Sequence, residues 1–104
     1  VGDLLRQVER VDPLLAAGQQ REGTRLLAAA MTACVALRLD LDAPPAQHEV
    51  AVWLYREALQ GGVVTPDEAG RVLLVCSLAD APEVPDSMSR EALEDARRML
   101  LATA

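Results

Sequence analysis

The stretch TPDEAGRVLLVCSLAD, residues 65–80, contains the strongest secondary-structure signal in the chain. Thr65 is a favourable N-cap residue, Pro66 suits the first position of a helix, and Asp67 places negative charge at the positive end of the helix dipole. Glu68 follows Thr65 by three residues, which is the spacing of a capping box. The stretch therefore predicts a helix that begins after Thr65 and continues to its end.

Comparable signals on both sides of this stretch predict four further helices, whereas patterns typical of strands are nearly absent. Proline and glycine separate the segments, because proline lacks the N–H that a helix interior needs and glycine readily ends a helix. These signals predict an all-α fold, a compact bundle of about five helices in a single domain that spans residues 1–104. The four further segments are residues 3–18 with an interruption at Pro13, residues 20–39 or 24–39, the segment from Pro44-Pro45 to Gly61-Gly62, and residues 87–101 or 89–101.

A short internal similarity indicates how the helices pair. The sequence EGTRLL at residues 22–27 is similar to EAGRVL at residues 68–73, and each copy follows a shorter helical segment that ends in glycine. Similar units that follow similar partners are typical of repeated helical hairpins. This similarity is compatible with two helical hairpins followed by a C-terminal capping helix.

Helical wheels separate central helices from flanking ones. The first and last expected helices each carry a single apolar stripe, whereas the second and fourth are apolar on nearly all sides. A helix that is apolar on both sides must be covered on both sides, which predicts that the second and fourth helices are central. In the fourth helix, Leu74 and Leu78 lie opposite the main apolar sector. We expect either that a neighbouring helix covers these leucines or that they form a self-association patch.

The only two aromatic residues, Trp53 and Tyr55, lie two positions apart on the third expected helix. Residues at this spacing point about 200° apart, so they cannot face the same core. The wheel places Tyr55 within the apolar stripe and Trp53 on the opposite, polar side. A tryptophan on a polar helix face is typical of an interface anchor, unless the linker after Asp80 or the N-terminal segment folds over it.

Composition and charge exclude several classes of protein. Of the 104 residues, 51% are hydrophobic and 25% are charged, which is typical of a folded globular domain and not of a disordered chain. The net charge is −6, and residues 41–104 supply all of it with eleven acids and five arginines. Such a field repels the backbone of a nucleic acid but is compatible with a basic protein or peptide surface.

The sequence also bears on location and origin. No apolar run approaches the roughly 18 residues of a membrane span and no secretory signal opens the chain, so we expect a cytoplasmic protein with no membrane partner. Lys, Asn, Ile and Phe, whose codons are rich in A and T, are all absent. This absence indicates a GC-rich genome and favours a bacterial origin.

Few residues are suited to catalysis or metal binding. Cys34 and Cys76 are the only cysteines and His48 is the only histidine, and this set lacks the Cys-x-x-Cys spacing of a structural zinc site. Both cysteines lie on core-facing sectors, which predicts buried free thiols. Nucleophilic catalysis would in every case depend on His48, which belongs to no recognisable motif. We therefore expect no enzyme activity, no metal and no cofactor.

These observations predict a non-enzymatic helical module that binds a protein or peptide, or a second copy of itself as a homodimer. Its acidic C-terminal half favours a basic partner surface. An alternative is a bundle that binds an apolar small molecule between its central helices, because the alanines at positions 28–30, 33 and 36 leave either close packing or a cavity. The partner-binding residues expected for the first interpretation are Trp53, Glu49, Arg56, Glu57, Gln60, Leu74 and Leu78.

Overall fold

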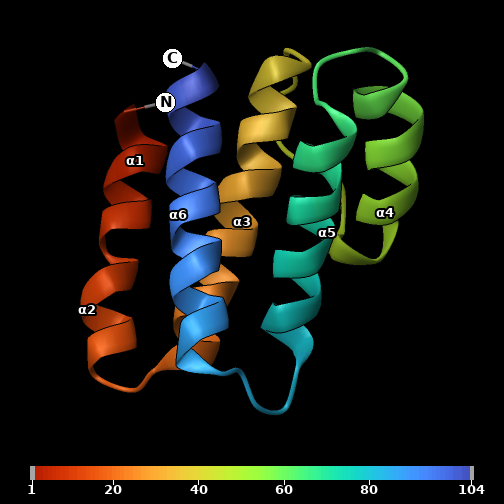
Figure 1. Cartoon of the computed structure of the whole chain (residues 1–104). Helices are drawn as coiled ribbons and strands as arrows, with labels where there is room; N and C mark the ends of the chain where they lie inside the picture. The colour runs from red at the N-terminus through yellow and green to blue at the C-terminus, as the bar shows by residue number, and fades with distance from the viewer. Residues whose placement is uncertain (1, 104) are drawn as a thin grey trace.

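The computed structural model describes residues 2–103, which form helices joined by short connections (Figure 1). Within this range there is no strand, and the predicted all-α bundle is confirmed. None of the helices described is long and apolar enough to cross a membrane. In chain order the elements are α1 (Gly2–Glu9), α2 (Val11–Ala16), α3 (Gln20–Arg38), the 3₁₀ turn η1 (Gln47–Glu49), α4 (Val50–Trp53), the π-helical segment η2 (Leu54–Leu59), α5 (Pro66–Asp80) and α6 (Asp86–Thr103).

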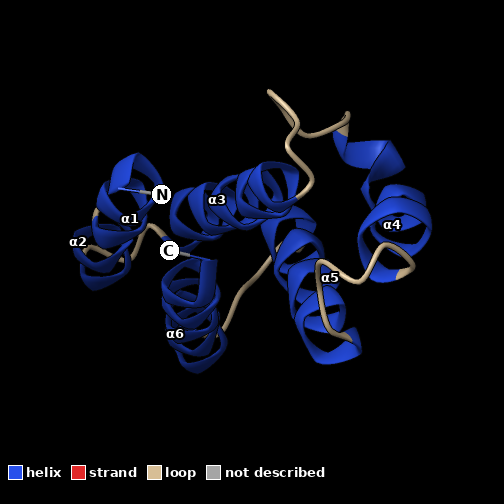
Figure 2. Cartoon of the chain, turned by 90° about the horizontal axis from the view of Figure 1, so that it is seen from above, coloured by secondary structure: helices blue, strands red, loops and turns tan. Residues whose placement is uncertain are grey.

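Helix α3 forms the centre of the molecule, as expected for the second predicted helix. It contacts α1, α2, α5 and α6, and Figure 2 shows α3 and α6 between the α1–α2 pair on one side and α5 with α4 on the other. The last helix, α6, packs along α3 and does not cap one end of the bundle, because its apolar stripe runs the length of the helix and needs a partner of similar length. The buried residues of α3 include Leu27, Ala30, Met31, Cys34 and Val35.

The start of α5 has the capping box that the sequence predicts. The backbone N–H of Glu68 donates to Thr65 Oγ1 at 3.0 Å, and the backbone N–H of Thr65 donates to Glu68 Oε1 at 3.0 Å. These two bonds satisfy donors that the first turn of a helix otherwise leaves unpaired. The strongest local signal in the sequence therefore fixes a helix end to the residue.

Two glycines end the third predicted segment at the expected place, and each has a structural reason. A Cβ on Gly61 would lie 2.4 Å from the backbone oxygen of Glu57, so only glycine fits there. Gly62 has a φ of +74°, in the left-handed region that glycine adopts without strain. The chain therefore turns back between η2 and α5 after residue 60.

Helix α5 contacts α3, α6 and η2, but part of its surface stays open, so the predicted cover on both sides is incomplete. Its inner side, which includes Val72 and Val75, is buried against the core. Leu78 is 7% exposed, so neighbouring elements cover it, whereas Leu73 and Leu74 are 39% and 47% exposed. The wheel alone could not distinguish a covered sector from an open one, because both are apolar.

The orientation of the third predicted helix also differs from the prediction. Trp53 is half-buried and packs against the core, whereas Tyr55 is 61% exposed. The buried line runs through Val50, Leu54 and Ala58 and is narrower than the predicted stripe. On a uniform wheel Trp53 lies about 60° from Val50 and Tyr55 about 60° from Ala58, so both border this line and only the packing of neighbouring elements decides which of them is covered. A large indole can reach the core from such a border position.

Candidate functional site

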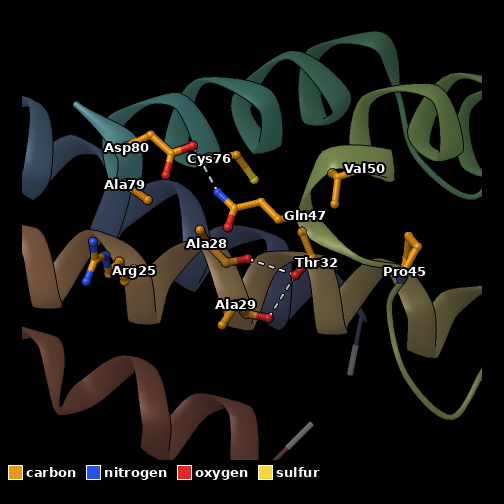
Figure 3. A pocket seen from close by; sticks show the side chains of 10 residues that line it. All are labelled: Arg25, Ala28, Ala29, Thr32, Pro45, Gln47, Val50, Cys76, Ala79 and Asp80. Atoms are coloured by element: carbon orange, nitrogen blue, oxygen red, sulfur yellow. Dashed lines mark hydrogen bonds between the residues drawn. The ribbon is translucent and has the colours of Figure 1, made fainter.

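A cavity of about 380 Å³ lies between α3, η1 and α5 and is half-open to solvent (Figure 3). The sequence predicted either close packing or a cavity here, because the second and fourth predicted helices carry many small residues. Its size falls at the lower end of the range for ligand pockets, about 300–1,000 Å³. We call it the α3–α5 cavity, and the residues that line it are Arg25, Ala28, Ala29, Thr32, Pro45, Gln47, Val50, Cys76, Ala79 and Asp80.

The cavity exists because the two helices present small side chains where they face each other. Ala28 and Ala29 line it from α3, and Ala79 lines it from α5. The hydroxyl of Thr32 donates within its own helix, to the carbonyl oxygens of Ala28 at 3.0 Å or Ala29 at 3.1 Å. The Thr32 proton is therefore engaged, and the side chain presents mainly its methyl group to the space.

The polar groups of the cavity come from three elements. Gln47 of η1 reaches across to α5 and donates from Nε2 to Asp80 Oδ2 at 3.0 Å. Arg25 of α3 also lines the space, and no carboxylate among residues 2–103 lies within ion-pair distance of its guanidinium. Burial raises the pKa of the Cys76 thiol, and the nearby Asp80 carboxylate raises it further. The thiol is therefore protonated at neutral pH and is a poor nucleophile.

The largest polar cluster lies at the opposite end of α3, where its role is structural. Arg38 donates to Glu68 Oε1 at 3.0 Å, to the Val63 carbonyl at 2.9 Å, to the Met99 carbonyl at 3.1 Å and to Thr103 Oγ1 at 2.8 Å. These contacts join α3 to α5, α6 and the turn before α5. With the contact from Nη2 to Glu68 Oε2 at 2.9 Å, all five N–H groups of the guanidinium are used, so Arg38 has no free donor to offer a ligand.

The residues predicted to bind a partner do not form one site. Glu49, Arg56, Glu57 and Gln60 are exposed on η1, η2 and the residue after it, as expected. Trp53, the predicted anchor, is half-buried against the core. Leu74 is exposed on α5, a different helix, whereas Leu78 is buried. The prediction that Trp53 points away from the core is therefore wrong.

A continuous exposed strip runs along α5, and only part of it was predicted from the sequence. It consists of Gly70, Leu73, Leu74 and Ser77, which share one side of the helix through their spacing of three and four residues. We call it the outer face of α5. Leu74 was expected opposite the main apolar sector, whereas the helical wheel places Leu73 inside that sector, and its 39% exposure corrects that placement. Val52, at 56%, and Tyr55 are exposed on the neighbouring helix and were also missed.

The residues considered for catalysis are scattered. His48 is exposed, and its Nε2 lies 3.7 Å from the Glu49 carboxylate. Cys34 is a buried free thiol, as predicted, whereas Cys76 is only half-buried. The Cys34 Sγ lies 3.0 Å from Thr103 Oγ1 of α6. In the described part of the chain no three His, Cys, Asp or Glu side chains form a group that could hold a metal ion.

No protein-family model, curated protein or solved structure matches this chain.

Proposed function

We propose that this chain is a non-enzymatic interaction module whose outer face of α5 docks a basic segment of a partner protein. The observation that carries the proposal is the exposure of the adjacent Leu73 and Leu74 on a helix whose opposite side is buried. Contiguous exposed apolar surface is typical of protein-binding sites. The cytoplasmic location and bacterial origin expected from the sequence belong to the same proposal.

The outer face of α5 has the shape that a partner helix needs. Its two leucines are flanked along the helix by Gly70 and Ser77, both small. A Cβ placed on Gly70 would meet no atom within 4 Å, so the surface there is open. A partner helix can approach closely beside Gly70 and bury the leucine side chains, which is the usual mode of helix recognition.

Charge favours a basic partner over a second copy of the chain. The net charge of −6 means that two copies repel each other, whereas a basic segment is attracted over a longer range. Asp42, Glu83 and Glu91 form no ion pair within residues 2–103, so their charges remain available. Four of the five arginines in the acidic part are already paired with carboxylates: Arg71, Arg90, Arg97 and Arg98.

A displayed library of amphipathic helical peptides tests this proposal. We expect selection on the wild-type chain to enrich peptides that carry apolar anchors flanked by Lys or Arg. Leu74→Glu should lower the affinity of the selected peptides by at least about tenfold, because it places a charge in the apolar contact. The affinities are measured by fluorescence anisotropy, and the melting temperature of the variant shows that its fold is retained.

Leu101→Glu is the matched control, since Leu101 is an exposed leucine on α6, at 64%, and the substitution changes the charge by the same amount. It should leave peptide affinity unchanged. Enrichment of acidic or neutral peptides, or equal losses in the two variants, would contradict the proposal. A wild-type melting temperature that rises with protein concentration and loses this dependence in Leu74→Glu would instead assign the face to self-association.

A further inference from the structure

The α3–α5 cavity has a charged end and an apolar end. In Figure 3, Arg25 and Asp80 lie toward one side of the cavity, while Pro45 and Val50 lie toward the other. The Ala28 and Ala29 side chains form part of the wall between the two ends. A ligand that fills this space therefore meets charge at one end and hydrocarbon at the other.

The antiparallel packing of α3 and α5 explains why the two charges share an end. Arg25 lies in the second turn of α3, and Asp80 is the last residue of α5. Arg21, one turn before Arg25, reaches the carbonyl oxygen of Pro82 just beyond α5 at 3.5 Å. At the other end of the pair, Arg38 contacts Glu68. The two contacts fix which end of α3 faces which end of α5.

The two charges do not neutralise each other. Arg25 and Asp80 line the same cavity, yet they are not within ion-pair distance of one another. Gln47 donates one hydrogen bond to the Asp80 carboxylate, which leaves further acceptor positions on its oxygens. The charged end therefore presents one cationic donor group and one anionic acceptor group to a ligand.

We propose that the α3–α5 cavity binds a small zwitterion with an apolar side chain, its carboxylate on Arg25 and its ammonium group on Asp80. Arg25 and Asp80 are both exposed to solvent, and a purely apolar molecule would gain nothing from either charge. A simple anion would pair with Arg25 but would be repelled by Asp80, and a simple cation would meet the reverse situation. A molecule of the size of an aliphatic amino acid satisfies both charges and places its side chain toward Val50 and Pro45.

Three probes of nearly equal shape test the proposal on the whole chain. L-leucine has both charges, 4-methylpentanoate lacks the ammonium group, and L-leucinamide lacks the carboxylate. We expect L-leucine to bind at least about tenfold more tightly than either analogue, as measured by calorimetry and by shifts of backbone amide resonances. Equal affinities for the three probes, or no binding of any at millimolar concentration, would overturn the proposal.

Substitutions assign the two charges. Arg25→Gln should lower the affinity for L-leucine by at least about tenfold and leave the affinity for L-leucinamide unchanged. Asp80→Asn should lower the affinity for L-leucine without lowering the affinity for 4-methylpentanoate. Arg10→Gln and Asp42→Asn, at exposed positions that do not line the cavity, are the matched controls and should have no effect. Losses of the same size in the controls would mean that general charge attracts the probe, and would overturn the assignment.

Cys76 provides a readout of where the probe binds. Its thiol lines the cavity and is half-buried, whereas Cys34 is buried in the core. L-leucine at concentrations that saturate the calorimetric signal should slow alkylation of Cys76 by N-ethylmaleimide. An unchanged rate at saturation would place the bound molecule outside the cavity and overturn the proposal.

Discussion

Arg38 shows how one side chain can hold several helices together. The side chain is only 13% exposed, and it reaches groups on α5, on α6 and in the turn before α5. The Glu68 carboxylate that it binds also closes the capping box with Thr65. A single guanidinium therefore joins the start of α5 to the ends of α3 and α6.

Arg38→Met tests this role, because methionine retains much of the apolar stem and removes the guanidinium. We expect the free energy of unfolding to fall by about 3 kcal/mol, since the substitution leaves the half-buried Glu68 carboxylate without its partner. Urea denaturation measures this change. The double variant Arg38→Met/Glu68→Met should recover part of the loss, because it removes the unpaired charge as well.

Arg56→Met is the comparison for this variant. Arg56 is exposed on η2 and forms no ion pair in the described part of the chain, so its substitution should change stability by no more than about 0.5 kcal/mol. If Arg38→Met and Arg56→Met had similar effects, the proposed role of Arg38 would be wrong.

At the scale of the element, the start of α5 combines a local signal with a tertiary contact. Thr65→Ala removes the oxygen that accepts the Glu68 N–H, and we expect it to lower the free energy of unfolding by about 1 kcal/mol. Thr65→Ser retains the hydroxyl and should cost much less. Thermal unfolding of the two variants provides the measurement, and equal losses would show that the threonine methyl and not the cap stabilises the helix.

The π-helical segment η2 shows why a helical wheel with uniform spacing fails on a short helix. In η2 the backbone hydrogen bonds span five residues, as in the bond from Gln60 N–H to the Tyr55 carbonyl at 3.3 Å. A π-helical turn holds more residues than an α-helical turn, so Ala58 returns to the line of Val50 and Leu54. A wheel of uniform spacing distributes these residues over too wide a stripe.

At the scale of the whole molecule, ion pairs make stability depend on pH. Hydrogen bonds from Arg38 lower the pKa of Glu68 below its ordinary value of 4.5, in spite of partial burial. Similar bonds from Arg97 on α6 lower the pKa of Glu9 on α1. A carboxyl group whose pKa is lower in the folded state stabilises the protein above its unfolded pKa, and this contribution is lost as the pH falls through the folded pKa.

We therefore expect the melting temperature of the wild-type chain to fall as the pH drops below 4.5, the ordinary pKa of glutamate. Glu68→Gln should be less stable at neutral pH and should lose less on acidification, because one of the contributing carboxylates is gone. Calorimetric melting across this pH range measures both slopes. Glu91→Gln, at an exposed position on α6, should retain the wild-type slope, and a shared change in slope would contradict the assignment to Glu68.

The helical segments and several of their ends were predictable from the sequence by itself, although the third segment begins at Gln47 and not at Pro44-Pro45, and the last begins at Asp86 and not at residue 87 or 89. Capping residues, prolines and glycines act on the backbone within a few residues, so Thr65, Pro66 and the Gly61-Gly62 pair determine local structure wherever the segment lies. The apolar stripe of α6, with Leu93, Ala96 and Leu100, was predictable for the same reason, because one helical period places these residues on one side.

Which apolar surfaces are covered was decided only by the tertiary structure. Leu74 and Leu78 lie in similar local sequence, and only the arrangement of the neighbouring helices leaves one exposed and buries the other. The packing of neighbouring helices also decides that Trp53 contacts the core and that Arg25 and Asp80 line the same cavity. Local sequence determines which residues share a side of a helix, but burial is a relation between helices that are distant in the chain, and no single segment contains it.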